Sequence, residues 1–432
     1  MKADRVSDTG DVMKETIVPT RSERADHNTG FGFSRIFHRL ARRAVFSNLE
    51  KLEYGRVTLI DGDSHHDFGK NGLRATVHVS NPAFYADLAL GGSIGAAEAF
   101  MSGCWSVDDL TALVRIMVRN REALLGMERG LAAIMKPVQA LRHWRRRNTP
   151  EGSLRNIAAH YDLGNDFYRL WLDRTMTYSC NIFEKEDATL EEAAISKYER
   201  ICRKLDLQPA DHVLEIGSGW GGFALHAAKN YGCRITTTTI SRQQYDYARE
   251  QIRREGLSDR IELLFEDYRN LQGTYDKLVS IEMIEAVGHH YMDTYFETCS
   301  RRLKPDGIMA LQAIVIEDRV YKAQLRNPDF IKRHIFPGSF IPSISAITHS
   351  VLKATDMRLF GLEDITRHYA RTLNAWRKRF LAGVDAVRAL GYPESFIRLW
   401  EYYFCYCEGG FLERYIGDVQ MVFTKPGWRN AG

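Results

Sequence analysis

The stretch DHVLEIGSGWGG, residues 211–222, is the feature that most constrains what this chain can fold into. A hydrophobic strand, 212–216, runs directly into a glycine loop with the spacing G-x-G-x-x-G. A loop of this kind follows the first strand of a parallel sheet, at the edge where nucleotide-containing ligands bind. The loop alone does not choose its ligand, because sites for NAD, FAD and S-adenosylmethionine share the spacing.

The chain around this loop alternates between strand and helix patterns. A T-x-x-E capping box, Thr189 and Glu192, predicts the start of a helix that runs to Leu205. The elements that follow are strand 212–216, helix 221–230, strand 233–239, helix 242–255, strands 261–266 and 276–282, helix 289–302, the turn LKPDG and strand 308–315. Such alternation predicts an α/β fold with a doubly wound, Rossmann-like sheet.

Length and composition divide the chain further, since 432 residues are too many for one ordinary core. We expect a disordered leader at 1–34, a smaller N-terminal α+β domain at 35–145, an exposed linker at 146–153 and a catalytic domain at 154–432. The sequence contains no apolar run of about 18 residues, so it predicts no membrane span. The seven cysteines lack paired metal-ligand spacing, so we expect reduced thiols and no metal site.

The polar residues around the loop favour one ligand. A dinucleotide site needs a carboxylate about 20 positions after the loop, but the second strand there ends in Thr236 to Thr239. Glu215, at the end of the first strand, can face a cationic ammonium; the alternative is a solvated strand-end acid. Asp267 can accept from an adenine amino group while Tyr268 covers the ring; the alternative is the cap of a following turn. Together these features indicate a class I S-adenosylmethionine-dependent methyltransferase.

The segment before the sheet, 159–194, is dense in aromatic residues: Tyr161, Phe167, Tyr168, Trp171, Tyr178 and Phe183. With HYDLGNDFY, TMTYSCNIF, VLEIGSGWGG, TISRQQ, IEAVG, IFPGSFIPS and HYARTLNAW in this order, the chain resembles the cyclopropane fatty acid synthase family, which includes the mycolic acid cyclopropane synthases. The resemblance is firm over about 154–425 and weaker over 35–145. It implies a helical substrate cover on the methyltransferase sheet and transfer of a methyl carbon to a cis double bond of a phospholipid acyl chain, giving a cyclopropane.

The chemistry of that reaction explains the residues it needs. Methyl transfer to one alkene carbon leaves a carbocation on the other, and ring closure requires loss of a proton to a weak base. Family members are understood to hold a bicarbonate ion as this base. By resemblance, the bicarbonate shell includes Cys180, Glu285, Tyr369, the backbone carbonyl of Ile314 and, at a histidine position of the family, Gln312. The resemblance assigns the cofactor shell to Tyr178, Ser179, Gly217, Gly219, Thr239, Gln244, Asp267 and Tyr268, alongside Glu215.

One position, Gln312, departs from the family's pattern. Gln312 can donate a hydrogen bond but cannot carry charge, so methylene- or methyl-branched acyl products, formed from the same carbocation, are alternatives to the ring. Cys407 matches a cysteine once nominated as a nucleophile, but the mechanism needs no thiolate and we expect a structural role. Two further alternatives are a small-molecule N- or O-methyltransferase and a non-enzymatic lipid-binding protein.

Basic segments bear on where the protein works. Residues 35–52 predict an amphipathic helix on which Arg35, Arg39, Arg42 and Arg43 surround an apolar face containing Leu40, Ala41 and Val45. Such a helix suits an anionic membrane surface or packing on its own domain. The basic run 142–147 and the segment 330–343, with Phe336 and Phe340, are further candidates for lipid contact. We expect a cytoplasmic enzyme that visits the inner membrane surface, with no nucleic-acid partner and with a homodimer left open.

Overall fold

The computed structural model describes residues 31–122, 124, 163–327 and 329–429, which form two compact units. Unit 1 contains the described residues up to 124 together with 329–335 and 381–413, and unit 2 contains 163–327, 336–380 and 414–429. The predicted linker 146–153, the run 142–147, Tyr161 and nearly all of the predicted leader lie outside the described residues. Helix α2, Phe31–Leu49, begins four residues before the predicted start of the N-terminal domain.

Unit 1 is built on a four-stranded sheet with helices, which agrees with the α+β pattern of its sequence. The strand order is β2-β1-β3-β4, with β1 antiparallel to β2 and parallel to β3. Its strands are β1 (Arg56–Asp61), β2 (Ser64–Gly69), β3 (Arg74–Val79) and β4 (Trp105–Val107). Its other helices are α3 (Ala83–Met101), α4 (Leu110–Arg119), the π-helix Ile331–Ile335, α16 (Val384–Ala389) and α17 (Glu394–Leu412).

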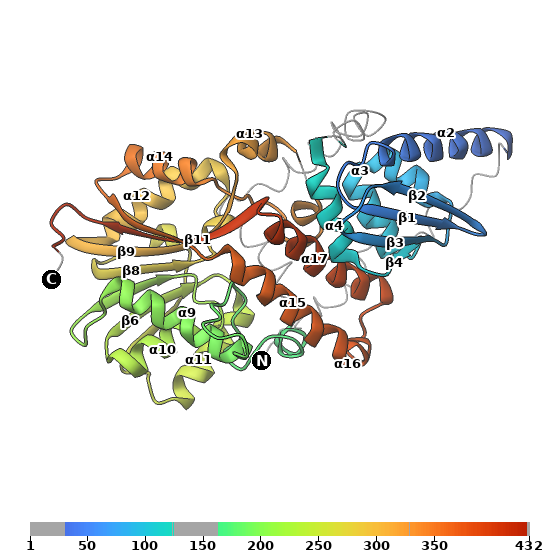
Figure 1. The fold of residues 1–432 in the computed structure, drawn as a ribbon. Coiled ribbons are helices and arrows are strands. Elements are labelled where there is room, and N and C mark those ends of the chain that lie inside the picture. The colour runs from blue at the N-terminus through green and yellow to red at the C-terminus, as the bar shows by residue number, and fades with distance from the viewer. Residues whose placement is uncertain (1–30, 123, 125–162, 328, 430–432) are drawn as a thin grey trace, which may run out of the picture. The chain divides into compact units, whose positions relative to one another are not determined.

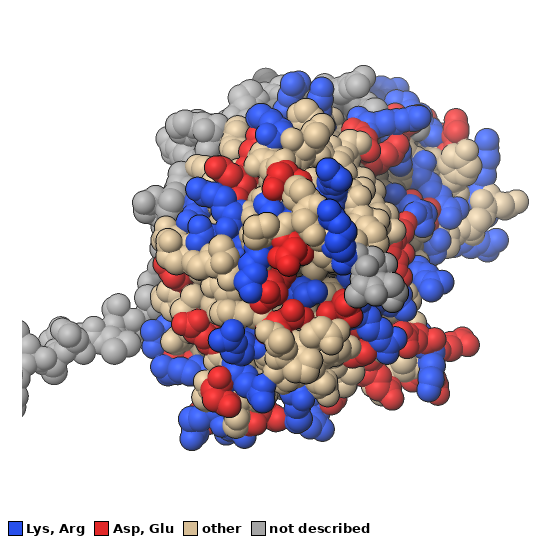
Figure 2. Space-filling view, turned by 90° about the vertical axis from the view of Figure 1, so that its left-hand side faces the viewer, with Lys and Arg blue, Asp and Glu red and all other residues tan. Residues whose placement is uncertain are grey.

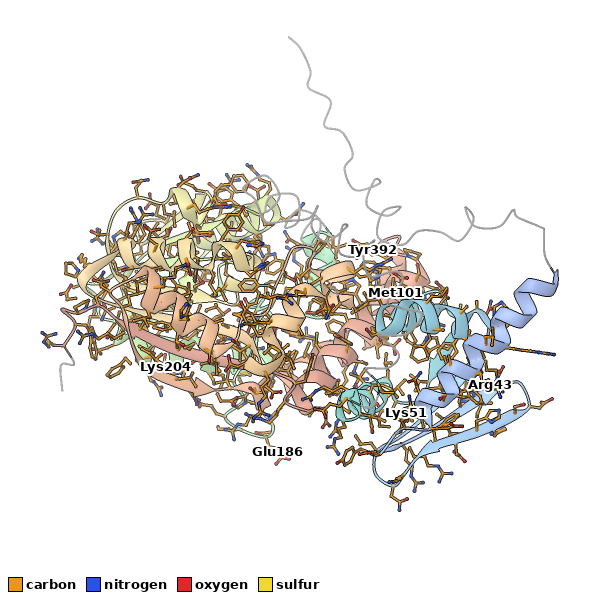
Figure 3. The ribbon with its side chains drawn as sticks, turned by 90° about the horizontal axis from the view of Figure 1, so that it is seen from above. Arg43, Lys51, Met101, Glu186, Lys204 and Tyr392 are labelled. Carbon is orange, nitrogen blue, oxygen red and sulfur yellow. The ribbon has the colours of Figure 1, made fainter. Side chains whose placement is uncertain are left out.

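Helix α2 packs its apolar face inside unit 1. Ala41, Val45 and Leu49 are buried, and α2 contacts α3. The guanidinium of Arg42 lies 4.5 Å from the Phe46 ring centroid, so this cation packs against a residue of its own helix. Leu40, expected on the apolar face, is 57% exposed, so the buried face is narrower than predicted. Figure 3 shows the neighbouring Arg43 on this helix.

Unit 2 contains a seven-stranded sheet in the order β10-β11-β9-β8-β5-β6-β7. The five strands from β9 to β7 run parallel, and β11 is antiparallel to both β9 and β10. The strands are β5 (His212–Ile216), β6 (Arg234–Thr239), β7 (Ile261–Phe265), β8 (Tyr275–Ile281), β9 (Leu303–Ile316), β10 (Arg358–Asp364) and β11 (Ile416–Thr424).

Helices cover both faces of this sheet, which confirms the doubly wound prediction. Figure 1 shows α9, α10 and α11 on one face and α12 and α14 on the other. The helices of unit 2 are α8 (Asn165–Arg169), α9 (Leu190–Leu205), α10 (Gly222–Tyr231), α11 (Arg242–Arg254), α12 (Met292–Arg302), α13 (Asp318–Arg326), α14 (Ile344–Ala354) and α15 (Thr366–Ala382). Short 3-10 turns lie at Tyr268–Asn270, Ile284–Ala286 and His289–Tyr291.

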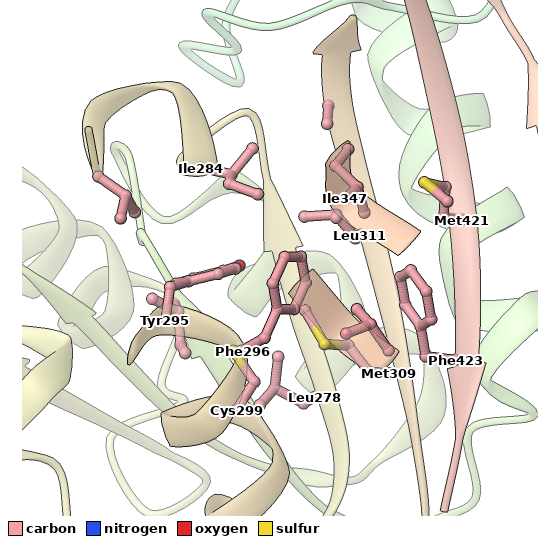
Figure 4. Close-up of a cluster of buried hydrophobic side chains, with 14 of the residues drawn as sticks. Leu278, Ile284, Tyr295, Phe296, Cys299, Met309, Leu311, Ile347, Met421 and Phe423 are labelled. Carbon is pink, nitrogen blue, oxygen red and sulfur yellow. The ribbon is translucent and has the colours of Figure 1, made fainter. Parts of the chain in front are cut away.

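Each face of the sheet has its own hydrophobic core. On the face covered by α12 and α14, Phe296 and Ile347 pack with Leu311 and Met421 of the sheet (Figure 4). On the opposite face, side chains of α9 and α10 pack against β5, β6 and β9. Burial of these apolar side chains fixes the sheet between its helices, and the carboxyl ends of the parallel strands are thereby held at one edge.

Three local predictions need correction. The turn LKPDG lies within β9, where residues 304–307 bulge between the pairs Tyr275–Leu303 and Lys277–Ile308. In its described part before α9, residues 163–189, the aromatic segment forms only the five-residue helix α8 and is otherwise irregular. In 330–343, the lipid-contact candidate Phe340 is buried and Phe336 is partly buried, whereas both were expected to be exposed.

The hydropathy and the surface charges of the described residues bear on membrane contact. No helix among them is long and apolar enough to cross a bilayer. Figure 2 shows Lys and Arg interspersed with Asp and Glu on the face that it presents. On that face, attraction to an anionic surface would therefore be opposed by neighbouring carboxylates.

Candidate active site

The glycine loop after β5 adopts a backbone that only glycine accepts without strain. Gly217, Gly219 and Gly221 have φ values of 95°, 50° and 92°. The N–H groups of Gly217 and Ser218 donate to the carbonyl of Thr238 on β6, at 3.1 and 2.8 Å. A Cβ at Gly217 would lie 3.0 Å from Cγ of Met283, so the loop closely approaches the turn after β8. This bare backbone fits a ligand such as S-adenosylmethionine that must come close to the main chain.

Thr239 and Gln244, both predicted to face the cofactor, meet at the end of β6. The Thr239 hydroxyl donates to Oε1 of Gln244 at 3.0 Å, and Gln244 is buried in the first turn of α11. Because Oε1 of Gln244 accepts this bond, its amide NH₂ group is the part of the side chain that could donate to a ligand. A contact of Gln244 with a ribose hydroxyl stays a prediction.

Glu215 is a buried acid, so the alternative of a solvated strand-end carboxylate is wrong. It is 2% exposed, and its Oε2 accepts from the Thr237 hydroxyl at 2.5 Å. Burial raises the pKa of Glu215 to about 8, against which the Thr237 bond and the charge of Lys197 act. A cationic ligand nearby would favour its ionised form. The predicted contact with the cofactor ammonium stays a prediction.

Asp267 forms the turn cap that was the alternative to an adenine contact. Its carboxylate accepts from the backbone N–H of Arg269 and, through both oxygens, from the Arg269 guanidinium at 2.8 and 2.6 Å. Tyr268 is buried, with its ring 5.5 Å from that of Tyr295. The roles of Asp267 and Tyr268 in adenine binding stay predictions. An adenine amino group that donates to Asp267 would share the carboxylate with Arg269.

Aromatic side chains gather around Tyr178. The rings of Trp171 and Trp376 lie 5.2 and 5.4 Å from its own, and that of Phe336 lies at 6.3 Å. Tyr168 completes this group at 5.6 Å. Ring faces attract a positive charge, so a carbocation formed beside this group would be stabilised.

Directly after Tyr178, three predicted shell residues converge on an acid that the sequence analysis missed. Glu282 follows β8 in a left-handed conformation with φ of 48°. Its Oε1 accepts from the backbone N–H of Cys180 at 2.8 Å and from Nε2 of Gln312 at 2.7 Å. Its Oε2 accepts from the Tyr369 hydroxyl at 2.7 Å. A carboxylate with three donors is held firmly in one orientation.

This arrangement decides whether the expected bicarbonate fits. The donors assigned to the ion at Cys180, Gln312 and Tyr369 are already bonded to Glu282. A second anion at these donors would stand against that carboxylate and compete with it for the same three groups. The residues present therefore do not fit a bicarbonate ion in addition to Glu282. The sequence predicted Glu215 and Asp267 as site residues because they are acids at the carboxyl ends of strands. The same rule would have selected Glu282, which is also an acid at the carboxyl end of a strand.

Glu285 lies beside this centre, in the 3-10 turn after Glu282. Its Oε1 accepts from the backbone N–H of Ile314 at 2.6 Å, and its buried Oε2 has no hydrogen-bond partner among the described residues. Burial and then the negative charge of Glu282 raise the pKa of Glu285 to about 8. Glu285 is thus neutral at pH 7. Ile314 contributes its N–H here, whereas the prediction used its carbonyl.

Two further buried groups complete the centre, and neither was predicted. Asp418 on β11, opposite Ile314, is fully buried, and burial together with the charge of Glu282 raises its pKa well above the ordinary value. Lys197 on α9 is also fully buried, and its Nζ donates to the Ser179 hydroxyl at 2.6 Å. Burial lowers the pKa of Lys197 to about 8, while the charge of Glu282 acts in the opposite direction. Lys197 is thus a buried cation whose charge interacts with buried acids of the centre.

Neither candidate cysteine acts as a thiolate here. Cys180 is fully buried, and burial followed by the charges of Asp418 and Glu282 raises the pKa of its thiol well above the ordinary value. Burial likewise raises the pKa of Cys407, which lies on α17 in unit 1, whereas the other candidates belong to unit 2. These surroundings oppose a nucleophilic role.

Comparison with known proteins gives the same family. The family model described as mycolic acid cyclopropane synthetase matches residues 148–421. The chain is 35% identical over 354 residues to tuberculostearic acid methyltransferase UfaA1 of Mycobacterium tuberculosis, covering 78% of this chain and 80% of that protein. It is 36% identical over 358 residues to cyclopropane-fatty-acyl-phospholipid synthase of Escherichia coli K12, covering 81% and 88%.

A solved structure agrees with this assignment. The mycolic acid cyclopropane synthase CmaA1, complexed with SAH and CTAB, superposes with a TM-score of 0.59 at 30% identity, over 63% of this chain and 98% of that one. The fold of unit 2 is thus the class I methyltransferase fold. The chain belongs to the mycolic acid cyclopropane synthetase family and is an S-adenosylmethionine-dependent methyltransferase.

Proposed function

We propose that the protein transfers the methyl carbon of S-adenosylmethionine to a cis double bond in an acyl chain of a membrane phospholipid. The carrying observation is the ring cluster around Tyr178, two residues before the Cys180 N–H that bonds Glu282. An isolated alkene is a weak nucleophile, and its attack on a methyl carbon generates a carbocation. Ring faces that stabilise a cation, set beside a hydrogen-bonded carboxylate, provide what this reaction needs.

The product follows from where the positive charge lies when the proton leaves. Loss of a methyl proton with the charge on the adjacent chain carbon closes a cyclopropane. A hydride shift that moves the charge to the methyl-bearing carbon, followed by loss of a methyl proton, leaves a methylene branch. We propose the cyclopropane as the main product and the methylene branch as the second candidate. The second candidate is favoured by Gln312, which stands at the family's histidine position and bonds Glu282. A saturated methyl branch would additionally need a reductant.

The substrate lies in a bilayer, so the enzyme must visit its surface. We propose the outward face of α2, where Arg39, Leu40 and Arg43 are exposed, as a contact with anionic lipid on the cytoplasmic side. An exposed leucine between two arginines can insert while the cations bind phosphates. Charge reversal of Arg39 and Arg43 should then weaken vesicle binding at low salt.

The test is an assay with S-adenosylmethionine carrying a labelled methyl group and vesicles of unsaturated phospholipid. We expect label in the acyl chain after hydrolysis of the lipid, and none with vesicles whose chains are saturated. Proton NMR then separates the products, because ring methylene protons resonate upfield of other alkyl protons and exocyclic alkene protons downfield. Label in the head group or in a soluble acceptor would contradict the proposal and support an N- or O-methyltransferase.

A further inference from the structure

The backbone and the hydrogen bonds of Glu282 hold its carboxylate in one defined position. Its φ of 48° lies in the left-handed region, which costs energy for a residue with a side chain. Its own N–H donates to the carbonyl of Gln312 at 2.8 Å, which ties this strained position to β9. The three donors to its carboxylate come from three other parts of the chain. Such a conformation persists only where the surroundings hold it.

The same donors are those that the family resemblance assigns to a bicarbonate ion. A glutamate carboxylate and a bicarbonate are both planar anions that share one negative charge between oxygens and accept from the same donors. We propose that the Glu282 carboxylate takes the place of bicarbonate and is itself the base that accepts the proton from the substrate cation. The enzyme then needs no bicarbonate for turnover. This inference rests on the proposed function.

Gln312 fits this role as a partner of Glu282. Its amide oxygen accepts from Nε2 of Gln420 at 3.0 Å, and Oε1 of Gln420 accepts from Nζ of Lys204 at 2.5 Å. This chain fixes which end of the Gln312 amide carries the oxygen, so its NH₂ group must face Glu282. The uncharged amide of Gln312 is a suitable hydrogen-bond donor for the carboxylate of Glu282, which belongs to the same chain. The departure at position 312 and the acid at position 282 therefore form one arrangement.

Titratable groups from several elements surround Glu282. The pKa of Glu285 in the following turn is raised to about 8, so this acid is neutral at pH 7, and burial with the charge of Glu282 raises the pKa of Asp418 on β11 well above its ordinary value. Lys197 on α9 supplies the cation, and the uncharged donors are Cys180 before α9, Gln312 on β9 and Tyr369 on α15. The surroundings of Glu282 thus combine one ammonium with three uncharged hydrogen-bond donors.

The proposed step is balanced in atoms and charge. The π electrons of the alkene form the bond to the methyl carbon, and the electrons of the broken C–S bond go to sulfur. The cation then loses a C–H bond, whose electrons complete the ring or a new double bond, and the proton goes to a carboxylate oxygen of Glu282. The acid returns this proton to water after product release. One alkene and one methyl donor thus give product, S-adenosylhomocysteine and a proton.

The experiment compares wild type, E282Q and E282G in the vesicle assay, with and without bicarbonate. Buffers are freed of carbon dioxide or supplemented with bicarbonate. We expect the wild-type rate to change less than twofold on bicarbonate removal, and E282Q to be at least about a hundredfold slower in either buffer, the scale of losing a positioned base. In E282G the left-handed backbone suits glycine and the donors lose their partner. Bicarbonate should therefore raise its rate at least about tenfold.

S-adenosylmethionine affinity and thermal unfolding establish that each variant is folded. Loss of wild-type activity without bicarbonate would overturn the proposal, as would an E282Q enzyme near the wild-type rate. A folded E282G that bicarbonate does not accelerate overturns the claim that both bases occupy one position. If E282G does not fold, the comparison of the wild-type rate with that of the nearly isosteric E282Q tests the proposal. A wild-type enzyme that labels no acyl chain in any buffer instead refutes the proposed function.

Discussion

Replacing Lys197 by methionine should make the protein more stable at neutral pH and much less active. Lys197 is fully buried, and its pKa is lowered from 10.5 to about 8. Each pKa unit corresponds to about 1.4 kcal/mol, so keeping this ammonium charged costs about 3 kcal/mol of folding free energy at pH 7. Methionine fills similar space without that cost. For a unit of this size the gain corresponds to a rise in Tm of roughly 6–12 °C.

The sign of the pH dependence makes the prediction specific. Below pH 8 both folded and unfolded chains bind the proton, so the full cost applies. Between pH 8 and 10.5 the unfolded chain holds a proton that the folded chain has lost, and the stability of the wild type rises with pH. The advantage of K197M over the wild type should thus shrink from about 3 kcal/mol at pH 7 to below about 1 kcal/mol at pH 10.

The assay is thermal unfolding followed by circular dichroism at both pH values, alongside turnover with vesicles. The matched control is K229M, which removes an exposed lysine paired with Glu255 at 2.8 Å and should shift stability by less than about 0.5 kcal/mol. Turnover of K197M should fall at least about tenfold, because Glu282 loses its buried counter-charge. An advantage of K197M that is equal at pH 7 and pH 10, or a loss of stability at pH 7, would refute the reasoning.

Three further variants test the other parts of the centre. Y369F removes a donor to Glu282 and should lower turnover roughly 10- to 100-fold, since a bond to a charged group contributes about 1.5–3 kcal/mol, with cofactor affinity unchanged by titration. E285Q mimics the neutral acid and should keep most turnover at pH 7, whereas E285A should abolish it with cofactor binding intact; equal losses in both would refute the neutral role. C407S should retain wild-type turnover, and an inactive but folded C407S would restore the nucleophile hypothesis.

Local sequence signals predicted most of unit 2. The capping box at Thr189 and Glu192 forms both of its hydrogen bonds at the start of α9. The glycine loop follows the first strand of the large sheet, and helices alternate with strands across it. These features depend on residues within a few positions of one another, so the pattern of one segment is enough to predict them. The bulge within β9 was missed because Pro and Gly there also suit a turn.

The centre of the site depends on contacts between distant positions. The donors to Glu282 lie 102, 30 and 87 residues away along the chain, at Cys180, Gln312 and Tyr369. Their meeting follows from the order of strands in the sheet, with β9 between β8 and β11. Family resemblance selected the three donors but not their acceptor, because it carried over only positions that match the family's pattern. Lys197 was missed because a lysine in a charged helix looks solvent-exposed.

The packing of α17 limits how this enzyme can be divided into fragments. Residues 381–413 belong to unit 1, where α17 contacts α3 and α4, Glu408 accepts from the Thr111 hydroxyl at 3.1 Å, and a Cβ at Gly409 would press on Val114. A fragment lacking residues 1–142 would keep α17 but lose both partner helices, which would uncover buried side chains such as Tyr402, whose ring lies 5.6 Å from that of Phe100 on α3. Producing the catalytic unit alone therefore requires a redesigned α17 surface or a new connection from residue 380 to residue 414.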